Sequence, residues 1–228
     1  MKKLLLAFAL LSGVMGMAQA GEYYTAEGKK VEVKEADTLF GGRPRIGFEY
    51  EYEKNAVGDG NNAGVSLYPG IAWKDGWITR AELMLEGNQD KAWSNGSEGN
   101  TTQTKVGIRL RKDFTLGNGF GGYVRGLVGR AMSNEDNYNY AYWEPALKYD
   151  FNKTWGMTAS YRLIRSIDGS TGHDKNKFRI GPNWNINDHH GIEFRYVKTY
   201  AAEGPSFLDF KNGQHKSDAY IVEYAYKF

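Results

Sequence analysis

Alternation of apolar and polar residues is the feature that most limits how this chain of 228 residues can fold. In residues 43–53, RPRIGFEYEYE, every second residue from Ile46 to Tyr52 is apolar or aromatic. A period of two puts these side chains on one face of a β-strand, whereas a helix would scatter them. The pattern recurs in residues 65–73, 79–86, 101–114, 120–130, 138–151, 155–165, 176–186, 190–198 and 217–228. The sequence therefore predicts an all-β fold of ten antiparallel strands.

The lengths of the segments and of their connections predict how the strands are arranged. Each segment has about ten residues, the length that a tilted strand needs to cross a bilayer. Short connections such as KDG and NKT alternate with longer polar ones such as NQDKAWSNGSEGN and TYAAEGPSFLDFKNGQHK. Outer-membrane barrels have an even number of strands, with short periplasmic turns and longer extracellular loops. Residues 43–228 are thus predicted to form an antiparallel transmembrane β-barrel.

The aromatic content supports a membrane barrel. The chain has 16 Tyr, 11 Phe and 6 Trp, together with 29 Gly and 25% charged residues. Aromatic girdles mark both membrane interfaces of such barrels, while the interior face of each strand can remain charged. The chain has no cysteine. This composition favours a barrel over a soluble secreted domain stapled by disulfides.

Residues 1–20, MKKLLLAFALLSGVMGMAQA, have the features of a secretory signal peptide: a basic start, an apolar core and a small-residue cleavage pattern. The apolar run is shorter than the roughly 20 residues of a membrane anchor, which is the alternative interpretation. Removing Lys2 and Lys3 would balance the 29 basic and 27 acidic residues, so a nucleic-acid partner has no electrostatic support. Export to the bacterial outer membrane is predicted.

Residues 21–42 fit the strand pattern poorly. They could form a periplasmic leader, a short hairpin or a segment that folds back into the lumen, and we favour the leader. Two further strands here would raise the barrel from ten to twelve. Proline interrupts three strands, at Pro69, Pro145 and Pro182, and the strand parity places all three on the outward face.

The same parity assigns charged side chains to the lumen. The predicted pore-lining basic residues are Arg45, Arg80, Arg109, Arg111, Arg125, Arg162, Arg179 and Arg195, and the acidic ones are Glu49, Glu51, Glu53, Glu82, Glu86 and Glu223. Glutamates gather on the first, third and last strands, which closure of the sheet brings to one wall, and arginines largely face them. Such a row of arginines could dock an anionic solute passing through the pore. The alternative is that the charges fill a narrow barrel as a salt-bridged core.

Three outward-facing cations lie at the predicted extracellular ends of their strands: Arg130, Arg165 and Lys198. At that height they would meet the phosphates of lipopolysaccharide rather than acyl chains. The alternative is that these side chains extend into water.

Two segments carry a resemblance to a known family: residues 178–200, FRIGPNWNINDHHGIEFRYVKTY, and residues 220–228, YIVEYAYKF. With the signal peptide and the arginine-lined face, they resemble the oligogalacturonate-specific monomeric porins, a family that includes sialic-acid-selective members. The resemblance implies a monomeric outer-membrane porin that passes acidic sugar oligomers by passive diffusion, with no cofactor. The track residues would then be Arg109, Arg111, Arg125, Arg162, Arg179 and Arg195. Members of that family have twelve strands, which differs from the ten counted here.

The chain ends on Phe228, and its last strand resembles the C-terminal signal that the barrel assembly machinery recognises. Two other functional classes compete with a porin. A closed structural or adhesin-type barrel would use surface loops, above all residues 199–216. A surface protease could use His173 with Asp174, or His215 with Asp218, but the spacing matches no nucleophile or metal motif, so we expect no enzyme activity, catalytic residue or metal.

Overall fold

The computed structural model describes residues 23–24, 30–31, 43–56, 61–73, 76–88, 102–133, 137–170, 172–204, 206, 208 and 210–228. The predicted signal peptide lies outside this range, as does most of the predicted leader. Within 21–42, β1 (Tyr23–Tyr24) and β2 (Lys30–Val31) pair with each other in a separate two-stranded sheet. None of the described segments is a helix with the length and apolar character needed to cross a membrane.

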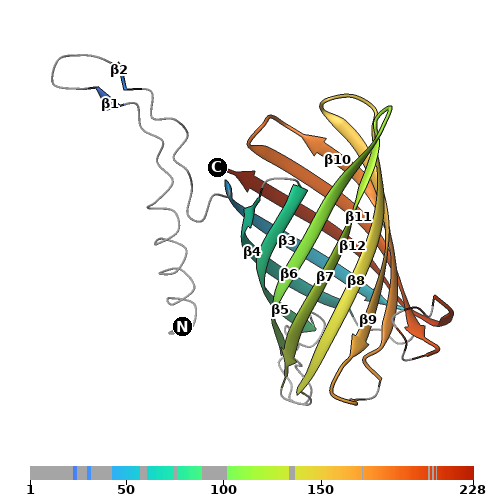
Figure 1. Cartoon of the computed structure of the whole chain (residues 1–228). Helices are drawn as coiled ribbons and strands as arrows, with labels where there is room; N and C mark the ends of the chain where they lie inside the picture. The colour runs from blue at the N-terminus through green and yellow to red at the C-terminus, as the bar shows by residue number, and fades with distance from the viewer. Residues whose placement is uncertain are drawn as a thin grey trace.

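Ten long strands form one closed antiparallel barrel (Figure 1). They are β3 (Arg43–Asn55), β4 (Asn61–Ala72), β5 (Trp77–Asn88), β6 (Thr102–Gly117), β7 (Phe120–Met132), β8 (Asn137–Asp150), β9 (Trp155–Ser166), β10 (Lys175–Asn185), β11 (His190–Ala202) and β12 (Asn212–Lys227). Each strand pairs with the next along the chain, and β12 closes the ring on β3 from Lys227↔Arg45 to Ser217↔Asn55. The predicted all-β fold with a ten-stranded barrel is confirmed.

The predicted strand parity also holds. Outward positions are strongly exposed, as at Ile108 (69%), Leu147 (63%) and Val128 (60%), because no protein layer covers them. On the glycine-rich β7, Tyr123 and Arg125 point inward and are buried. An exterior of exposed apolar side chains around a polar interior inverts the order of a soluble protein and suits a lipid surrounding.

The prolines lie in β4, β8 and β10, as the sequence predicts. Beside each of them the ladder to one neighbouring strand is interrupted without a change of register. Between β10 and β11, for example, the pairing passes from Ile180↔Tyr196 directly to Asn183↔Glu193, skipping Pro182. A proline has no N–H to donate, so each of these ladders loses two pairs but the strand keeps its alternation.

The two ends of the barrel differ. Residues 118–119, 151–154 and 186–189 form short connections at one end, which we call the turn end. The C-terminus is tied down there, since the Phe228 N–H donates to the Pro44 carbonyl (3.1 Å) and the Lys227 N–H to the His189 carbonyl (2.8 Å). Aromatic rings gather at this end, including Trp155 stacked on Trp184 at 5.5 Å. The opposite end, which we call the loop end, carries the longer connections.

One loop-end segment covers part of the outer wall. Residues after β11 lie against the outward faces of β8 and β9, where the Phe210 ring contacts Trp143 at 6.1 Å and Tyr161 at 5.6 Å. Arg165 lies beneath this segment and is only 1% exposed. Its guanidinium donates to the Ser206 carbonyl (3.1 Å) and to Asn176 Oδ1 (2.9 Å). The predicted contact of Arg165 with lipopolysaccharide is therefore wrong: the side chain has the outward parity, but a tertiary contact removes it from the surface.

We expect Arg165→Ala to lower the free energy of unfolding by about 1–3 kcal/mol, because buried carbonyl and amide acceptors lose their donor. Urea unfolding of the protein in detergent, followed by tryptophan fluorescence, measures this change. Arg130→Ala is the matched control, since Arg130 is an outward arginine near the same end of the barrel but exposed. It should change stability by less than about 0.5 kcal/mol. Equal effects of the two substitutions would contradict a structural role for Arg165.

Candidate functional site in the barrel interior

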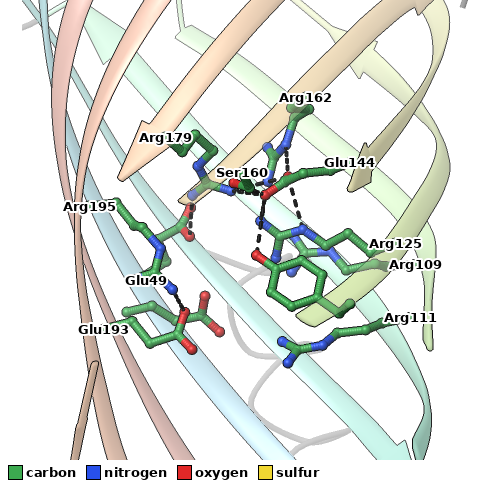
Figure 2. A network of polar contacts seen from close by, with 12 residues as sticks. Glu49, Arg109, Arg111, Arg125, Glu144, Ser160, Arg162, Arg179, Glu193 and Arg195 are labelled. Carbon is green, nitrogen blue, oxygen red and sulfur yellow. Dashed lines mark hydrogen bonds and ion pairs between the residues drawn. The ribbon is translucent and has the colours of Figure 1, made fainter. Parts of the chain in front are cut away.

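Glu144 on β8 is the centre of a charge network at the middle of the barrel (Figure 2). The side chain is 0% exposed. Arg125 binds its carboxylate in a bidentate manner, with Nε at 2.9 Å and Nη2 at 2.8 Å. Arg162 donates through Nε at 2.5 Å and Arg179 through Nη1 at 3.4 Å. One buried carboxylate thus binds three guanidinium groups that come from three different strands.

Two hydroxyl groups complete the coordination of this carboxylate. Ser160 Oγ donates to Glu144 Oε1 at 2.7 Å, and the Tyr123 hydroxyl donates to the same oxygen at 3.3 Å. A buried carboxylate needs donors on all its lone pairs to offset the loss of water. The strands on both sides of β8 supply them, since Tyr123 lies on β7 and Ser160 on β9.

Further ion pairs join strands that are not neighbours. Arg80 Nη1 lies 2.9 Å from Glu223 Oε1, and Arg179 Nη2 lies 3.8 Å from Glu49 Oε2. Lys177 Nζ lies 3.4 Å from Glu51 Oε1. Each pair spans the lumen, because two strands separate its members in the barrel order. Cations on one wall therefore reach the glutamates of the other wall and close the space between them.

Tyrosine rings pack against the arginines inside the barrel. The Arg109 guanidinium lies 4.4 Å from the Tyr68 ring centroid and its Nη2 is 2.5 Å from Glu82 Oε2. Arg162 lies 4.2 Å from the ring of Tyr142. A guanidinium group stacks well on an aromatic face, and the contact is stronger where water is excluded. These rings fill the gaps that the ion pairs leave.

A small cavity remains on the loop-end side of the network. It has a volume of about 60 Å³ and is lined by acidic residues of β3, tyrosines of β8 and lysines of β10. Since a water molecule takes roughly 30 Å³ of liquid volume, the cavity has room for about two. The hydroxyl groups of Tyr140 and Tyr142 and two guanidinium nitrogens of Arg109, Nε and Nη1, are buried in this region without a hydrogen-bond partner. Water or a small solute is needed to satisfy them.

The interior residues predicted from the sequence are where parity places them, but their environment differs from an open pore. Arg80, Arg109, Arg125, Arg179 and Arg195 are at most 5% exposed, and Glu49, Glu51, Glu82 and Glu223 at most 8%. The arginines were expected to face an open lumen, but side chains fill the lumen here, because a barrel of ten strands is narrow enough for them to bridge it. The alternative of a salt-bridged filling describes the middle of the barrel. The side chain of Glu86 lies outside the described residues.

The remaining interior charges lie toward the ends. Glu53 accepts a hydrogen bond from Ser217 Oγ, and Arg195 pairs with Glu193. At the turn end Arg111 Nε lies 2.5 Å from Asp113 Oδ1, a half-exposed pair. Arg45 and Lys227 are direct cross-strand partners there. Two cations opposite each other repel, so positive charge is concentrated locally at the turn-end mouth.

Sequence reasoning did not select Glu144 as a site residue, although its parity is inward. It is the acidic residue in the middle of β8, between the arginines of β7 and β9, whereas Asp150 lies at the end of the strand. This position could have identified Glu144 from the sequence, because a carboxylate between two strands that carry arginines has to neutralise several of those arginines. Tyr68, Tyr123 and Tyr142 were missed for another reason, since tyrosines are expected on the outward girdles of a barrel.

The remaining residues singled out in the sequence lie on the outer wall or at the loop end. Arg130 is exposed and Lys198 is half-buried opposite Asp218, both on the outer wall. His173 stacks on Tyr138 with the ring centroids 3.7 Å apart, and Asp174 accepts a hydrogen bond from the Ser166 N–H at 2.8 Å. His215 Nε2 lies 3.3 Å from Asp218 Oδ2. These contacts hold the loop ends in place, and no group of residues suited to a metal ion occurs in the part of the chain that the structure describes.

Asp168 organises the connection between β9 and β10. It accepts hydrogen bonds from Ser170 Oγ (2.5 Å), the Asn139 N–H (2.5 Å) and Ser166 Oγ (2.8 Å). These donors lower the pKa of the Asp168 carboxyl, Ser170 most and then Asn139 and Ser166. A lowered pKa means that this carboxylate stabilises the loop above its ordinary pKa and loses that effect only as the pH falls through the lowered value.

Comparison with known proteins shows the fold. No family model matches the chain, and no curated protein matches it. Among solved structures, an outer-membrane channel from Pseudomonas putida F1 is similar at 12% identity with a TM-score of 0.50, over 82% of this chain and 96% of that one. The KdgM porin in complex with disordered oligogalacturonate has 9% identity and a TM-score of 0.41, over 81% and 99% of the two chains. The NanC porin has 10% identity and a TM-score of 0.39, over 82% and 100%. The first of these similarities shows that the chain has the fold of an outer-membrane β-barrel.

Proposed function

We propose that this barrel is a narrow outer-membrane channel that favours small anionic solutes and that conducts when the central charge network parts. The observation that carries the proposal is the excess of cations over acids among the described interior side chains. The cations are Arg45, Arg80, Lys105, Arg109, Arg111, Arg125, Lys148, Arg162, Lys175, Lys177, Arg179, Arg195 and Lys227; the acids are Glu49, Glu51, Glu53, Glu82, Asp113, Glu144, Asp150, Glu193 and Glu223. An interior with surplus positive charge attracts anions and repels cations.

Two places along the barrel would provide docking points for an anion. At the turn-end mouth, Arg45 and Lys227 face each other as like charges. Further in, Arg109 is 2% exposed, and its Nε and Nη1 atoms have no hydrogen-bond partner. A guanidinium in a site of low dielectric gains more from an anion than it would in water. A solute could pass from one point to the other if the ion pairs between them exchange partners.

The narrow interior limits the size of the solute. A cavity of about 60 Å³ holds water or a small inorganic or organic anion, and a sugar oligomer would require the side chains of the network to move aside. We therefore favour small anions over the acidic sugar oligomers that the family resemblance implies. We infer a passive, monomeric channel that needs no cofactor and that the barrel assembly machinery recognises through Phe228.

Planar-bilayer recording with a salt gradient tests the channel. The wild type should show single-channel steps with an anion-selective reversal potential. Arg45→Glu with Lys227→Glu should move the reversal potential toward cation selectivity, because the mouth then carries the opposite charge. The matched control is Lys54→Glu, an exposed residue of β3 with outward parity, which should leave selectivity unchanged.

The second candidate function is a closed structural barrel, and the three-arginine coordination of Glu144 favours it. Such a barrel would show no conductance steps in the wild type or in the charge-reversed variant. Cation selectivity of the wild type would also contradict the anion channel. A surface-binding role for residues 203–214 would appear as a loss of binding on their deletion with conductance unchanged.

A further inference from the structure

A groove lies on the outer wall of the barrel near the loop end, apart from the interior site. It runs over β6, β7 and β8, which are side by side in Figure 1. Its volume is about 690 Å³, and Val106, Ile108 and Val128 are among the residues that line it. These three side chains are 38%, 69% and 60% exposed. The groove is thus an open apolar depression in the surface that faces lipid.

Paired glycines form the floor of the groove. Gly107 of β6 and Gly129 of β7 are direct cross-strand partners. A Cβ added at Gly129 would lie 2.6 Å from the Val106 carbonyl oxygen. The two backbones therefore approach more closely here than a residue with a side chain would allow. Glu82 of the interior face also lines the groove, because its cross-strand partner Gly107 has no side chain to cover it. The wall is therefore thin here.

A cation and an amide lie at the upper end of the groove. Arg130 follows Val128 on the same outward face of β7 and is exposed. Asn139 of β8 is its cross-strand partner, and Ile167 closes this end. Two carboxylates are near, and both are engaged: Glu82 pairs with Arg109 in the interior, and Asp168 accepts hydrogen bonds from the Asn139 N–H and two serine hydroxyls. Arg130 is therefore the charged group of the groove that remains available to an anion.

We propose that this groove binds one lipid A moiety of lipopolysaccharide, with an acyl chain along Val106, Ile108 and Val128 and a phosphate on Arg130. The order of the groups matches such a lipid, because Ile108 and Val128 lie further from the loop end than Arg130, which pairs across the strands with Val106. Arginine binds phosphate through two parallel N–H···O hydrogen bonds. An acyl chain that fills the space over the glycines gains van der Waals contacts there. The proposal rests on the outer-membrane orientation of the barrel and not on conduction.

The other two cations predicted to meet lipopolysaccharide lack these features. Arg165 is covered by the segment after β11. Lys198 lies opposite Asp218, an acidic partner that would repel a phosphate. The groove therefore selects Arg130 among three residues that the sequence treats alike.

Native mass spectrometry of the full-length protein in detergent, titrated with lipid A that carries both phosphates, tests the site. Arg130→Gln should weaken binding about tenfold, the factor that corresponds to losing one charge-assisted hydrogen bond. Val128→Trp should weaken it by filling the groove. Lys198→Gln, a cation on the same outer wall, is the matched control and should bind as the wild type does. Dephosphorylated lipid A should bind the wild type and Arg130→Gln equally weakly.

Three results would overturn the proposal. The first is equal binding of lipid A to the wild type and to Arg130→Gln. The second is an equal loss in Lys198→Gln, which would mean that any outer-wall cation suffices. The third is displacement of the lipid by excess inorganic phosphate, which would mark Arg130 as a site for free anions. Because binding is measured without conduction, a failed channel experiment leaves this test intact.

Discussion

Replacing Glu144 with alanine is expected to lower the free energy of unfolding of the barrel by about 3–5 kcal/mol, the cost of breaking a buried ion pair by removing one partner. Arg125, Arg162 and Arg179 would keep their positive charges in a space that excludes water. Glu144→Gln should lie between alanine and the wild type, because an amide oxygen still accepts one hydrogen bond. Urea unfolding in detergent, followed by tryptophan fluorescence, measures both variants.

Asp113→Ala provides the matched control for this experiment. Asp113 also pairs with an interior arginine, Arg111, at 2.5 Å, but the two side chains are 37% and 20% exposed. A solvated pair contributes at most about 1 kcal/mol, so this variant should be close to the wild type. Similar losses for Glu144→Ala and Asp113→Ala would mean that burial does not set the strength of the network. Neutral behaviour of Glu144→Ala would show that water enters the centre of the barrel.

Substituting alanine for Gly181 is expected to cost about 1–3 kcal/mol or more, the range for overpacking a close-packed site. A Cβ at this position would lie 2.0 Å from the Phe194 carbonyl oxygen on β11, a distance that backbone atoms cannot tolerate. Strands β10 and β11 would have to separate beside Pro182, where the ladder already lacks pairs. Gly181→Val should prevent refolding from urea, which far-UV circular dichroism would detect.

Gly191→Ala is the control for the glycine experiment. Gly191 lies in the same strand pair, opposite Asn185, but a Cβ there would meet its nearest atom at an ordinary 3.8 Å. Its substitution should leave stability within about 0.5 kcal/mol of the wild type. A loss as large as that of Gly181→Ala would show that any side chain in this ladder is destabilising and would contradict the close approach at Gly181.

Local sequence patterns were enough to predict the strands and their faces. Alternation places Val128 outward and Arg125 inward on β7, although that strand is rich in glycine. A charged residue on the lipid face costs several kcal/mol, so one parity is strongly preferred even where the apolar signal is weak. The alternation also placed the three prolines outward. Each of them interrupts the hydrogen-bonded ladder to one neighbouring strand, but the alternation of the strand continues past it. These features depend only on residues near each other in the chain.

Contacts between distant residues were not predictable in the same way. Arg130 and Arg165 have the same parity and a similar place on their strands, yet one is exposed and the other is 1% exposed. The difference arises because the segment after β11 folds back over β8 and β9. Sequence periodicity does not predict where a loop will pack, because the position of a loop depends on the side chains that it contacts on the barrel surface.

The sequence by itself determined an antiparallel barrel with a charged interior, because a period of two and a strand length suited to a bilayer leave few other solutions. It favoured ten strands but left twelve open, and the structure shows ten in the closed barrel. Only the tertiary structure decided whether that interior is open. The glutamates and arginines do lie on the walls that the sequence assigns, but the reach of a guanidinium across a narrow lumen, and the place of Glu144 among Arg125, Arg162 and Arg179, are set by barrel width and register. Those quantities exist only once the sheet closes.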